Sequence, residues 1–135
     1  RLPSPPAIDW FLDDTRIDLV VSANIASQLG AVPLMYLLHH IEIDTAAAKI
    51  FEAGLMQRHF QWLDYFSCPS VILCDAVRTM FDPDGSICSV EPLLDQMGLG
   101  SPTEKWDWPV APVGEINGGG GMKTEVHVYC DRLPA

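Results

Sequence analysis

The chain has 135 residues, the size of a single folded domain with one hydrophobic core. Its 18 acidic residues outnumber its 8 basic ones and give a formal net charge of −10. Phosphate backbones and anionic lipid surfaces repel a chain of this sign, so we expect neither nucleic acid nor a membrane as a partner. Because the sequence has neither a signal-peptide pattern nor an apolar run of about 20 residues, we expect a cytoplasmic protein.

The first predicted strand and the turn after it lie within Arg16–Gln28. Ile17–Ala23 is almost continuously apolar, as strands are when helices cover both faces of a parallel sheet. Asn24 follows, and its side-chain oxygen can cap the first N–H groups of a helix. Ligands of open α/β sheets bind beyond the carboxyl ends of strands, so Ser22–Gln28 is the expected place for chemistry. The alternative is a polar turn that only caps the helix.

Three helical segments are predicted after this turn. Gly30 and Val32-Pro33 end a first short helical segment and start the next one. The apolar residues of this second segment have helical spacing and should pack on the sheet: Leu34, Leu37, Leu38 and Ile41. Asp44 can cap a longer helix, Thr45–Phe66. His59 lies on its apolar side, where a hydrogen-bonded core histidine is more common than a catalytic base.

A second continuous apolar strand is predicted at Ser70–Val77. A helix between two such parallel strands makes a right-handed crossover. Asp75 falls near the carboxyl end of this strand, beside the expected positions of Ser22 and Asn24, and Arg78 follows it. Asp75 is therefore either a functional carboxylate at the ligand-binding edge or the ion-pair partner of Arg78.

The remaining segments have turn and strand patterns. Asp82–Gly85 predicts a tight turn, because oxygen ligands are missing where a calcium loop needs them. A short strand at Ile87–Val90 should follow, and then a brief helix that begins at Glu91-Pro92 and ends at Gly98.

The last two strands should form a hairpin. Lys105–Val113 alternates apolar and polar residues and contains Pro109, which is typical of an edge strand. Thr124–Leu133 alternates in the same way and predicts a half-buried strand. Gly118–Gly121 lies between them and is similar to a phosphate loop, but a strand follows where such a loop needs a helix. We therefore expect a mobile hairpin loop with no role in binding phosphate.

Neither the cysteines nor the histidines have the spacing of a metal site. The four cysteines do not form a Cys-x-x-Cys pair, and we expect reduced thiols: Cys68, Cys74, Cys88 and Cys130. His39 and His40 are adjacent, so on a helix they point about 100° apart and cannot both face one ion. The sequence therefore predicts no metal.

The order of these elements resembles the carboxy-terminal half of the class I, Rossmann-like S-adenosylmethionine-dependent methyltransferases. Ile17–Asn24 with the helix after it is similar to the fourth strand of that family and its exit loop. Ser70–Val77 then corresponds to the fifth strand, and Lys105–Val113 with Thr124–Leu133 to the final reversed pair. The glycine-rich turn and the acidic residue with which the family holds its cofactor are absent from this sequence.

The resemblance implies an α/β fold with a partial Rossmann-like, methyltransferase-type sheet, flanking helices and a C-terminal antiparallel β-hairpin. We expect residues 1–135 to form a single α/β domain, either complete or the C-terminal half of a larger one. The cofactor would be S-adenosylmethionine. The implied cofactor-binding residues are Ser22 and Asn24, and the implied substrate-binding residues are Gln28, Asp75 and Arg78. The resemblance assigns no catalytic base, because many of these enzymes only align methyl group and acceptor.

Three functions therefore remain open at the level of sequence. The first is a methyltransferase-like domain that carries the acceptor side of the site. The second is a non-catalytic small-molecule-binding or assembly module with part of the same fold, and the third is a small hydrolase that uses Asp75 or the histidines. A sheet without the family's first strands would leave Ile17–Ala23 as an exposed edge, so we expect a homodimer through this strand or pairing with an upstream half-domain.

Overall fold

The computed structural model describes residues 6–95 and 97–132, the last two by their backbone alone. The chain contains both helices and strands, as the α/β prediction requires. Its described residues form two compact units. Unit 1 contains the chain as far as Val71 and again from Asp131, and unit 2 contains Ile72–Cys130.

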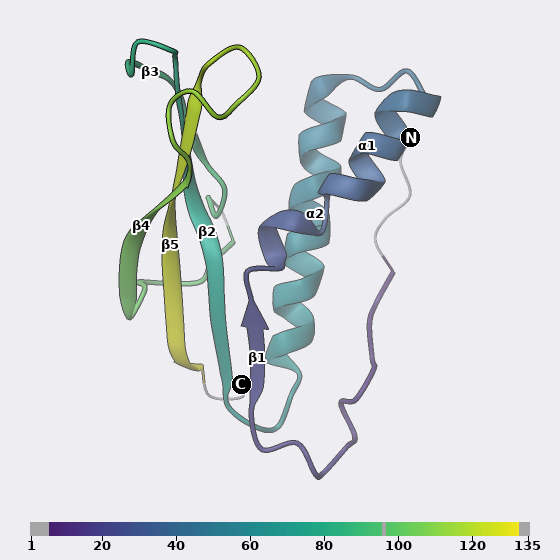
Figure 1. The fold of residues 1–135 in the computed structure, drawn as a ribbon. Coiled ribbons are helices and arrows are strands. Elements are labelled where there is room, and N and C mark those ends of the chain that lie inside the picture. Colours follow the sequence, from purple (N-terminus) through teal and green to yellow (C-terminus); the bar gives the residue numbers. More distant parts are fainter. Residues whose placement is uncertain (1–5, 96, 133–135) are drawn as a thin grey trace. The chain divides into compact units, whose positions relative to one another are not determined.

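Unit 1 contains one short strand and three helical segments (Figure 1). They are β1 (Val20–Ala23), the 3₁₀ turn η1 (Ala26–Gln28), α1 (Ala31–His40) and α2 (Thr45–Asp64). β1 is shorter than the predicted strand at Ile17–Ala23, because regular pairing begins only at Val20. The N–H of Val20 donates a hydrogen bond to the carbonyl of Pro69 at 3.1 Å. β1 is an end strand in the hydrogen-bonded order.

Asn24 does not cap a helix, so this part of the prediction is wrong. Ile25 is the residue that precedes η1, and no side chain caps this turn. The backbone of Asn24 has a φ of 53°, which lies in the left-handed region. Asparagine tolerates that region better than most residues, whereas a helix N-cap needs an extended backbone. Asn24 therefore redirects the chain between β1 and η1.

α1 begins after Gly30, as predicted, but its apolar face is not buried. No residue of α1 is fully buried, and Leu38 is 56% exposed. The helix contacts α2 and η1 instead of burying its apolar stripe in a core. Gly30 lies where α1 begins beside α2, and a Cβ there would come within 2.6 Å of Cγ of Glu52. The prediction that this stripe is covered by the sheet is therefore wrong.

α2 begins where the sequence predicted. Oδ1 of Asp44 accepts a hydrogen bond from the N–H of Ala46 at 3.0 Å, so Asp44 is the N-cap. The helix ends at Asp64, with Tyr65 as its C-cap, two residues before the predicted end at Phe66. One side of the helix is buried, at Ala48, Met56, His59, Phe60 and Leu63.

Unit 2 is built from antiparallel strand pairs (Figure 1). Its strands are β2 (Ser70–Phe81, whose first two residues belong to unit 1), β3 (Ile87–Pro92), β4 (Glu104–Ala111) and β5 (Gly121–Arg132, whose last two residues belong to unit 1). β5 lies between β2 and β4, and β3 pairs with the second half of β2. β4 is an end strand, so the predicted edge strand with Pro109 and the predicted C-terminal hairpin are confirmed. Leu133, the predicted end of the last strand, lies outside the described residues.

The segment after the Asp82–Gly85 turn differs from the prediction. The turn itself is confirmed, because the N–H of Gly85 donates to the carbonyl of Asp82 at 2.9 Å. The strand that follows continues through Pro92, where a helix was predicted to begin. The N–H of Leu93 then donates to the carbonyl of Ala76 at 2.8 Å, which extends the contact with β2. No helix forms between this point and Gly98 among the described residues.

The glycine-rich loop between β4 and β5 packs closely at its second half. A Cβ on Gly120 would come within 2.6 Å of the carbonyl oxygen of Phe81. A Cβ on Gly121 would come within 2.8 Å of the backbone nitrogen of Val113. These two positions need glycine because another backbone segment occupies the space of a side chain.

Candidate functional site

The site begins with a buried contact between β1 and α2 in unit 1. Oγ of Ser22 lies 2.7 Å from Nε2 of His59, a hydrogen bond between residues 37 positions apart in the chain. Ser22 is 4% exposed and His59 is 8% exposed. Sequence analysis named Ser22 as a cofactor-binding residue and His59 as a core histidine or a base, but it did not predict that the two residues meet.

The local structure explains why both side chains point inward. Successive side chains of a strand alternate between its faces, and Ser22 is buried while Val21 and Ala23 are exposed. His59 lies on the buried side of α2, one helical turn from Met56 and Leu63. Its ring centroid is 5.8 Å from that of Trp62. The imidazole is therefore held by packing as well as by Ser22.

Burial controls the protonation of this histidine. Removal from water disfavours the imidazolium and lowers the pKa of His59 below its ordinary value of 6.5. The neutral ring can accept a hydrogen bond from the hydroxyl of Ser22 when its own proton is on Nδ1. His59 is therefore a neutral base at neutral pH.

The pair opens onto a pocket of about 360 Å³. The lining residues carry no charged side chain: Val20, Val21, Ser22, Ala23, Ile25, His59, Trp62 and Leu63. Val21 is 54% exposed and Ile25 is 47% exposed, so these two form the outer part of the wall. The pocket is an apolar chamber with one polar pair, the composition typical of small-molecule sites.

Asn24 adds a second polar feature beside this pocket. Its Oδ1 is buried and has no hydrogen-bond partner in the described structure. The residue lies between Ala23 and Ile25, which both line the pocket, but it is not itself a lining residue. A buried acceptor without a partner is costly to a folded protein, so each such atom calls for an explanation. A ligand that donates a hydrogen bond would satisfy Asn24.

The other predicted site residues are not in this pocket. Gln28 is exposed at the end of η1 and does not contribute to the lining. Asp75 lies in unit 2 in the middle of β2, because this strand continues to Phe81. Its carboxylate accepts a hydrogen bond from Oγ1 of Thr124 at 3.3 Å. The prediction that Asp75 stands near the carboxyl end of its strand is therefore wrong.

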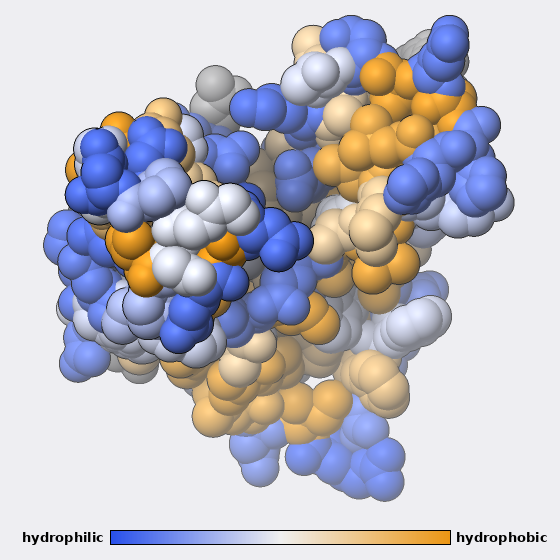
Figure 2. All heavy atoms as spheres, turned by 45° about the horizontal axis from the view of Figure 1, so that its top comes forward, coloured by the Kyte–Doolittle hydropathy of each residue, from blue (hydrophilic) through white to orange (hydrophobic). Residues whose placement is uncertain are grey.

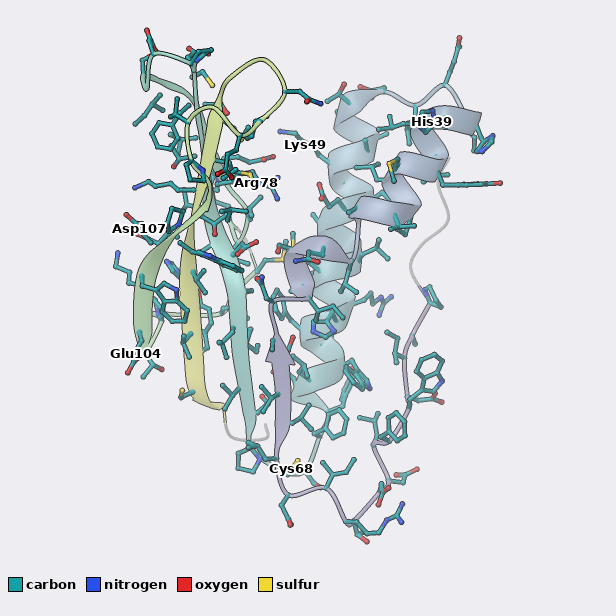
Figure 3. All side chains as sticks on the ribbon, in the orientation of Figure 1. His39, Lys49, Cys68, Arg78, Glu104 and Asp107 are labelled. Carbon is teal, nitrogen blue, oxygen red and sulfur yellow. The ribbon has the colours of Figure 1, made fainter. Side chains whose placement is uncertain are left out.

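Arg78 has a partner other than the one the sequence suggested. Its Nη1 lies 3.3 Å from Oε2 of Glu91 on β3, in a partly exposed ion pair (Arg78 is labelled in Figure 3). Asp75 and Arg78 are three positions apart on one strand, so their side chains point to opposite faces. The structure thus brings Ser22 to the pocket wall and leaves Asn24 next to the lining residues but outside the lining, and it does not bring Asp75 and Arg78 together.

Unit 2 contains a second hydrogen-bonded histidine, His127, which differs from His59 because both of its ring nitrogens have protein partners. Nε2 of His127 lies 2.6 Å from Oε1 of Glu125, and its Nδ1 lies 3.2 Å from the hydroxyl of Tyr129. The hydrogen bond from His127 lowers the pKa of the Glu125 carboxyl, which is only partly exposed to solvent. Both ring nitrogens of His127 are occupied, so this histidine is satisfied within the protein.

The described residues were also compared with the requirements of a metal site and of a membrane-spanning helix. The described residues contain no group of three or more His, Cys, Asp or Glu side chains that could hold a metal ion. His39 and His40 line a wide hollow after α1, together with Glu42 and Asp44 (Figure 3 shows His39). Among the described helices, none combines the length and apolar character that a membrane crossing needs.

Comparisons with family models, curated proteins and solved structures gave no significant match to this chain.

Proposed function

We propose that the chain is an S-adenosylmethionine-dependent methyltransferase-like module, and that the pocket at Ser22 and His59 receives part of the cofactor or its methyl acceptor. The observation that carries this proposal is the buried Ser22–His59 pair, which opens onto an apolar pocket at β1. The sequence around this strand, Ile17–Asn24, is the stretch that resembles the fourth strand of those enzymes. A partial Rossmann-like sheet is part of the same proposal.

The residues present fit such a ligand in two respects. Oδ1 of Asn24 is a buried acceptor that an amine or hydroxyl of the ligand can satisfy. The net charge of −10 attracts the positive sulfonium of the cofactor, whereas it would repel an anionic ligand. When bound, the cofactor supplies an electrophilic methyl group.

The chain's own residues would then act mainly by positioning. Ser22 would orient groups at the pocket wall, Asn24 would bind from its position just outside the lining, and Gln28 would contact substrate from the exposed end of η1. Asp75 and Arg78 stay proposed as acceptor-side residues with weaker support, because each already has a partner in unit 2. Alignment of methyl group and acceptor is sufficient for catalysis by proximity.

The proposal is tested by titrating S-adenosylmethionine and S-adenosylhomocysteine into the protein in a calorimeter. We expect binding of both, and Asn24→Gly should weaken it roughly fivefold to tenfold because one buried hydrogen bond is lost. Glycine keeps the left-handed backbone at this position, so the variant removes the amide without straining the turn. Gln57→Ala, an exposed change on α2, is the matched control and should bind as the wild type does.

Failure of both ligands to bind would overturn the methyltransferase proposal. The second candidate, a non-catalytic small-molecule-binding module, is favoured by the uncharged lining of the pocket. It would be supported if the protein bound small apolar compounds but neither cofactor form.

Two further aspects of the proposal concern assembly and location. We propose a homodimer in which β1 pairs with its own copy, supported by its position as an end strand and by Leu19 and Val21, which are 53% and 54% exposed. Pairing with an upstream half-domain is the alternative.

A cytoplasmic location is supported by four free cysteines, since thiols stay reduced in that compartment.

A further inference from the structure

We infer that α1 and the hollow at its C-terminal end form a docking surface for a basic amphipathic helix of a partner protein. This inference does not depend on the proposed function. α1 has the composition of a buried helix, because residues 31–38 carry no charged side chain and are apolar on every side of the helix. Leu34 and Leu37 are half-buried, however, and no residue of α1 is fully buried. The described part of the chain therefore leaves much of the apolar surface of α1 uncovered.

Four large apolar side chains of α1 are exposed at helical spacing. Met35 and Tyr36 follow Val32 at i+3 and i+4, and Leu38 follows Met35 at i+3, so neighbouring members lie side by side. All four are more than half exposed, from 56% at Met35 to 70% at Val32. We call these four residues the α1 patch, which is part of the apolar surface coloured orange in Figure 2. Neighbouring exposed side chains of this kind mark a site of interaction.

A hollow of about 610 Å³ continues from the end of the α1 patch. Residues 38–44 line it, so Leu38 belongs to both features. Its formal charges are the carboxylates of Glu42 and Asp44, and its lining has no lysine or arginine. The last carbonyl groups of α1 also lie here, and the C-terminus of a helix carries partial negative charge. An ammonium or guanidinium group is therefore the electrostatic complement of this hollow.

The carboxylate of Asp44 keeps some capacity for such a group. Its Oδ1 accepts the hydrogen bond from the N–H of Ala46 that caps α2. A carboxylate has two oxygens and about four lone-pair sites, so one capping bond does not exhaust it. Glu42 is exposed in the same connection and is free to turn toward a bound cation.

Charge decides among the partners that could cover this surface. A second copy of the chain has the same net charge of −10, and its α1 and hollow contain no lysine or arginine to pair with Glu42. The same charge repels an anionic lipid surface. A basic amphipathic helix fits both features, because its apolar stripe can pack on the α1 patch while a lysine or arginine reaches the hollow.

The test uses three designed helical peptides of about four turns each. The first has leucines along one side and lysines on the other, the second has the same composition shuffled so that no apolar stripe remains, and the third has glutamate in place of lysine. Fluorescence anisotropy of the labelled peptides at about 0.15 M salt measures their affinity for the whole chain. We expect the first peptide to bind about tenfold more tightly than either of the others, because it alone complements both the α1 patch and the hollow. Equal binding of the shuffled or the glutamate peptide would overturn the inference.

Substitutions in the α1 patch locate the apolar contact. Met35→Gln should weaken binding of the leucine–lysine peptide roughly fivefold to tenfold, because a large apolar side chain no longer becomes buried. Ile87→Gln is the matched control, since Ile87 is a 61% exposed apolar residue on β3, and it should bind the peptide as the wild type does. Equal weakening by the two substitutions would contradict the assignment. The comparison of peptides on the wild type decides the question even if one variant fails to fold.

Substitutions of single carboxylates locate the basic contact. Glu42→Gln should weaken binding of the same peptide roughly threefold, because an exposed ion pair is lost. Glu104→Gln changes the net charge by the same amount at an exposed position on β4 and should leave the affinity unchanged. If both variants lose affinity equally, the attraction is a property of net charge alone and the hollow is not the site.

Two further measurements identify the other occupants. If Met35→Gln dissociates a wild-type dimer in sedimentation equilibrium, the α1 patch is a contact between copies and the inference is wrong. If wild-type protein sediments with vesicles of phosphatidylcholine and phosphatidylglycerol and Met35→Gln does not, the patch faces lipid and the inference is also wrong. We expect neither result.

Discussion

At the scale of single residues, burial determines which groups can take part in chemistry. His59 is neutral because it is removed from water, and its contact with Ser22 directs one ring nitrogen toward the pocket. Asn24 contributes a buried oxygen without a partner because its left-handed backbone carries the chain from β1 into η1. Both features depend on the environment of one side chain and can be tested by single substitutions.

The lowered pKa of His59 predicts a pH-dependent stability. Below 6.5 the unfolded chain binds a proton at this position that the folded protein resists, so folding stability should fall as the pH is lowered from 6.5. Urea unfolding of the wild type and of His59→Gln between pH 7.5 and pH 5 (roughly the window given by the histidine pKa) measures this effect. We expect the stability of the variant to depend less on pH, and parallel curves would contradict the assignment.

Burial also predicts which cysteines react. Loss of hydration and the neighbouring Asp75 raise the pKa of the Cys74 thiol to about 12, so its reactive thiolate is scarce. Cys88 and Cys130 are exposed, so a reagent in solution can reach their thiols. Iodoacetamide labelling followed by mass spectrometry should modify Cys88 and Cys130 in the folded protein. Cys74 should react only after unfolding, and labelling at an equal rate would contradict its burial.

At the scale of elements, the points where α2 and β3 begin are set by residues next to them in the sequence. α2 begins at an aspartate whose carboxylate caps it, and β3 follows a turn at Asp82–Gly85 whose last residue has a positive φ. β1 and α1 are different, because β1 pairs over a short stretch and α1 exposes much of its apolar surface, coloured orange in Figure 2.

Asp44→Ala tests the cap directly. Removing the carboxylate leaves the N–H of Ala46 without its acceptor and should reduce the free energy of unfolding by about 1 kcal/mol. Glu42→Ala, which removes an exposed carboxylate from the same connection, is the control and should leave stability nearly unchanged. Chemical denaturation followed by circular dichroism measures both, and equal losses would mean that net charge rather than capping matters.

At the scale of the whole molecule, β1 is the end strand through which we propose that two copies of the chain pair. The N–H of Val20 is used within the chain, on the carbonyl of Pro69. Because successive N–H groups of a strand point in opposite directions, the N–H of Val21 points to the other side of β1. An isologous dimer would use this donor.

Val21→Pro therefore separates intermolecular from intramolecular pairing. Proline removes the donor of Val21 but leaves the hydrogen bond from Val20 to Pro69 intact. Sedimentation equilibrium at micromolar concentration should show a dimer for the wild type and for Val21→Ala, and a monomer for Val21→Pro. A monomeric wild type would refute the proposed dimer.

The sequence by itself determined the features whose causes lie within a few residues. The cap at Asp44, the turn at Asp82–Gly85 and the hairpin of β4 and β5 were all predicted, because capping, turn conformation and alternation are properties of neighbouring residues. The helix predicted after Glu91 failed because pairing with β2 outweighed the local signal.

Only the tertiary structure decided the candidate site. Ser22 and His59 are 37 residues apart, and no local pattern in either segment specifies the other. Their contact exists because one buried strand side chain and one buried helix face meet in the core of unit 1, and the low polarity there also sets the pKa of His59. Sequence periodicity gives the face of each element, but packing decides which faces meet.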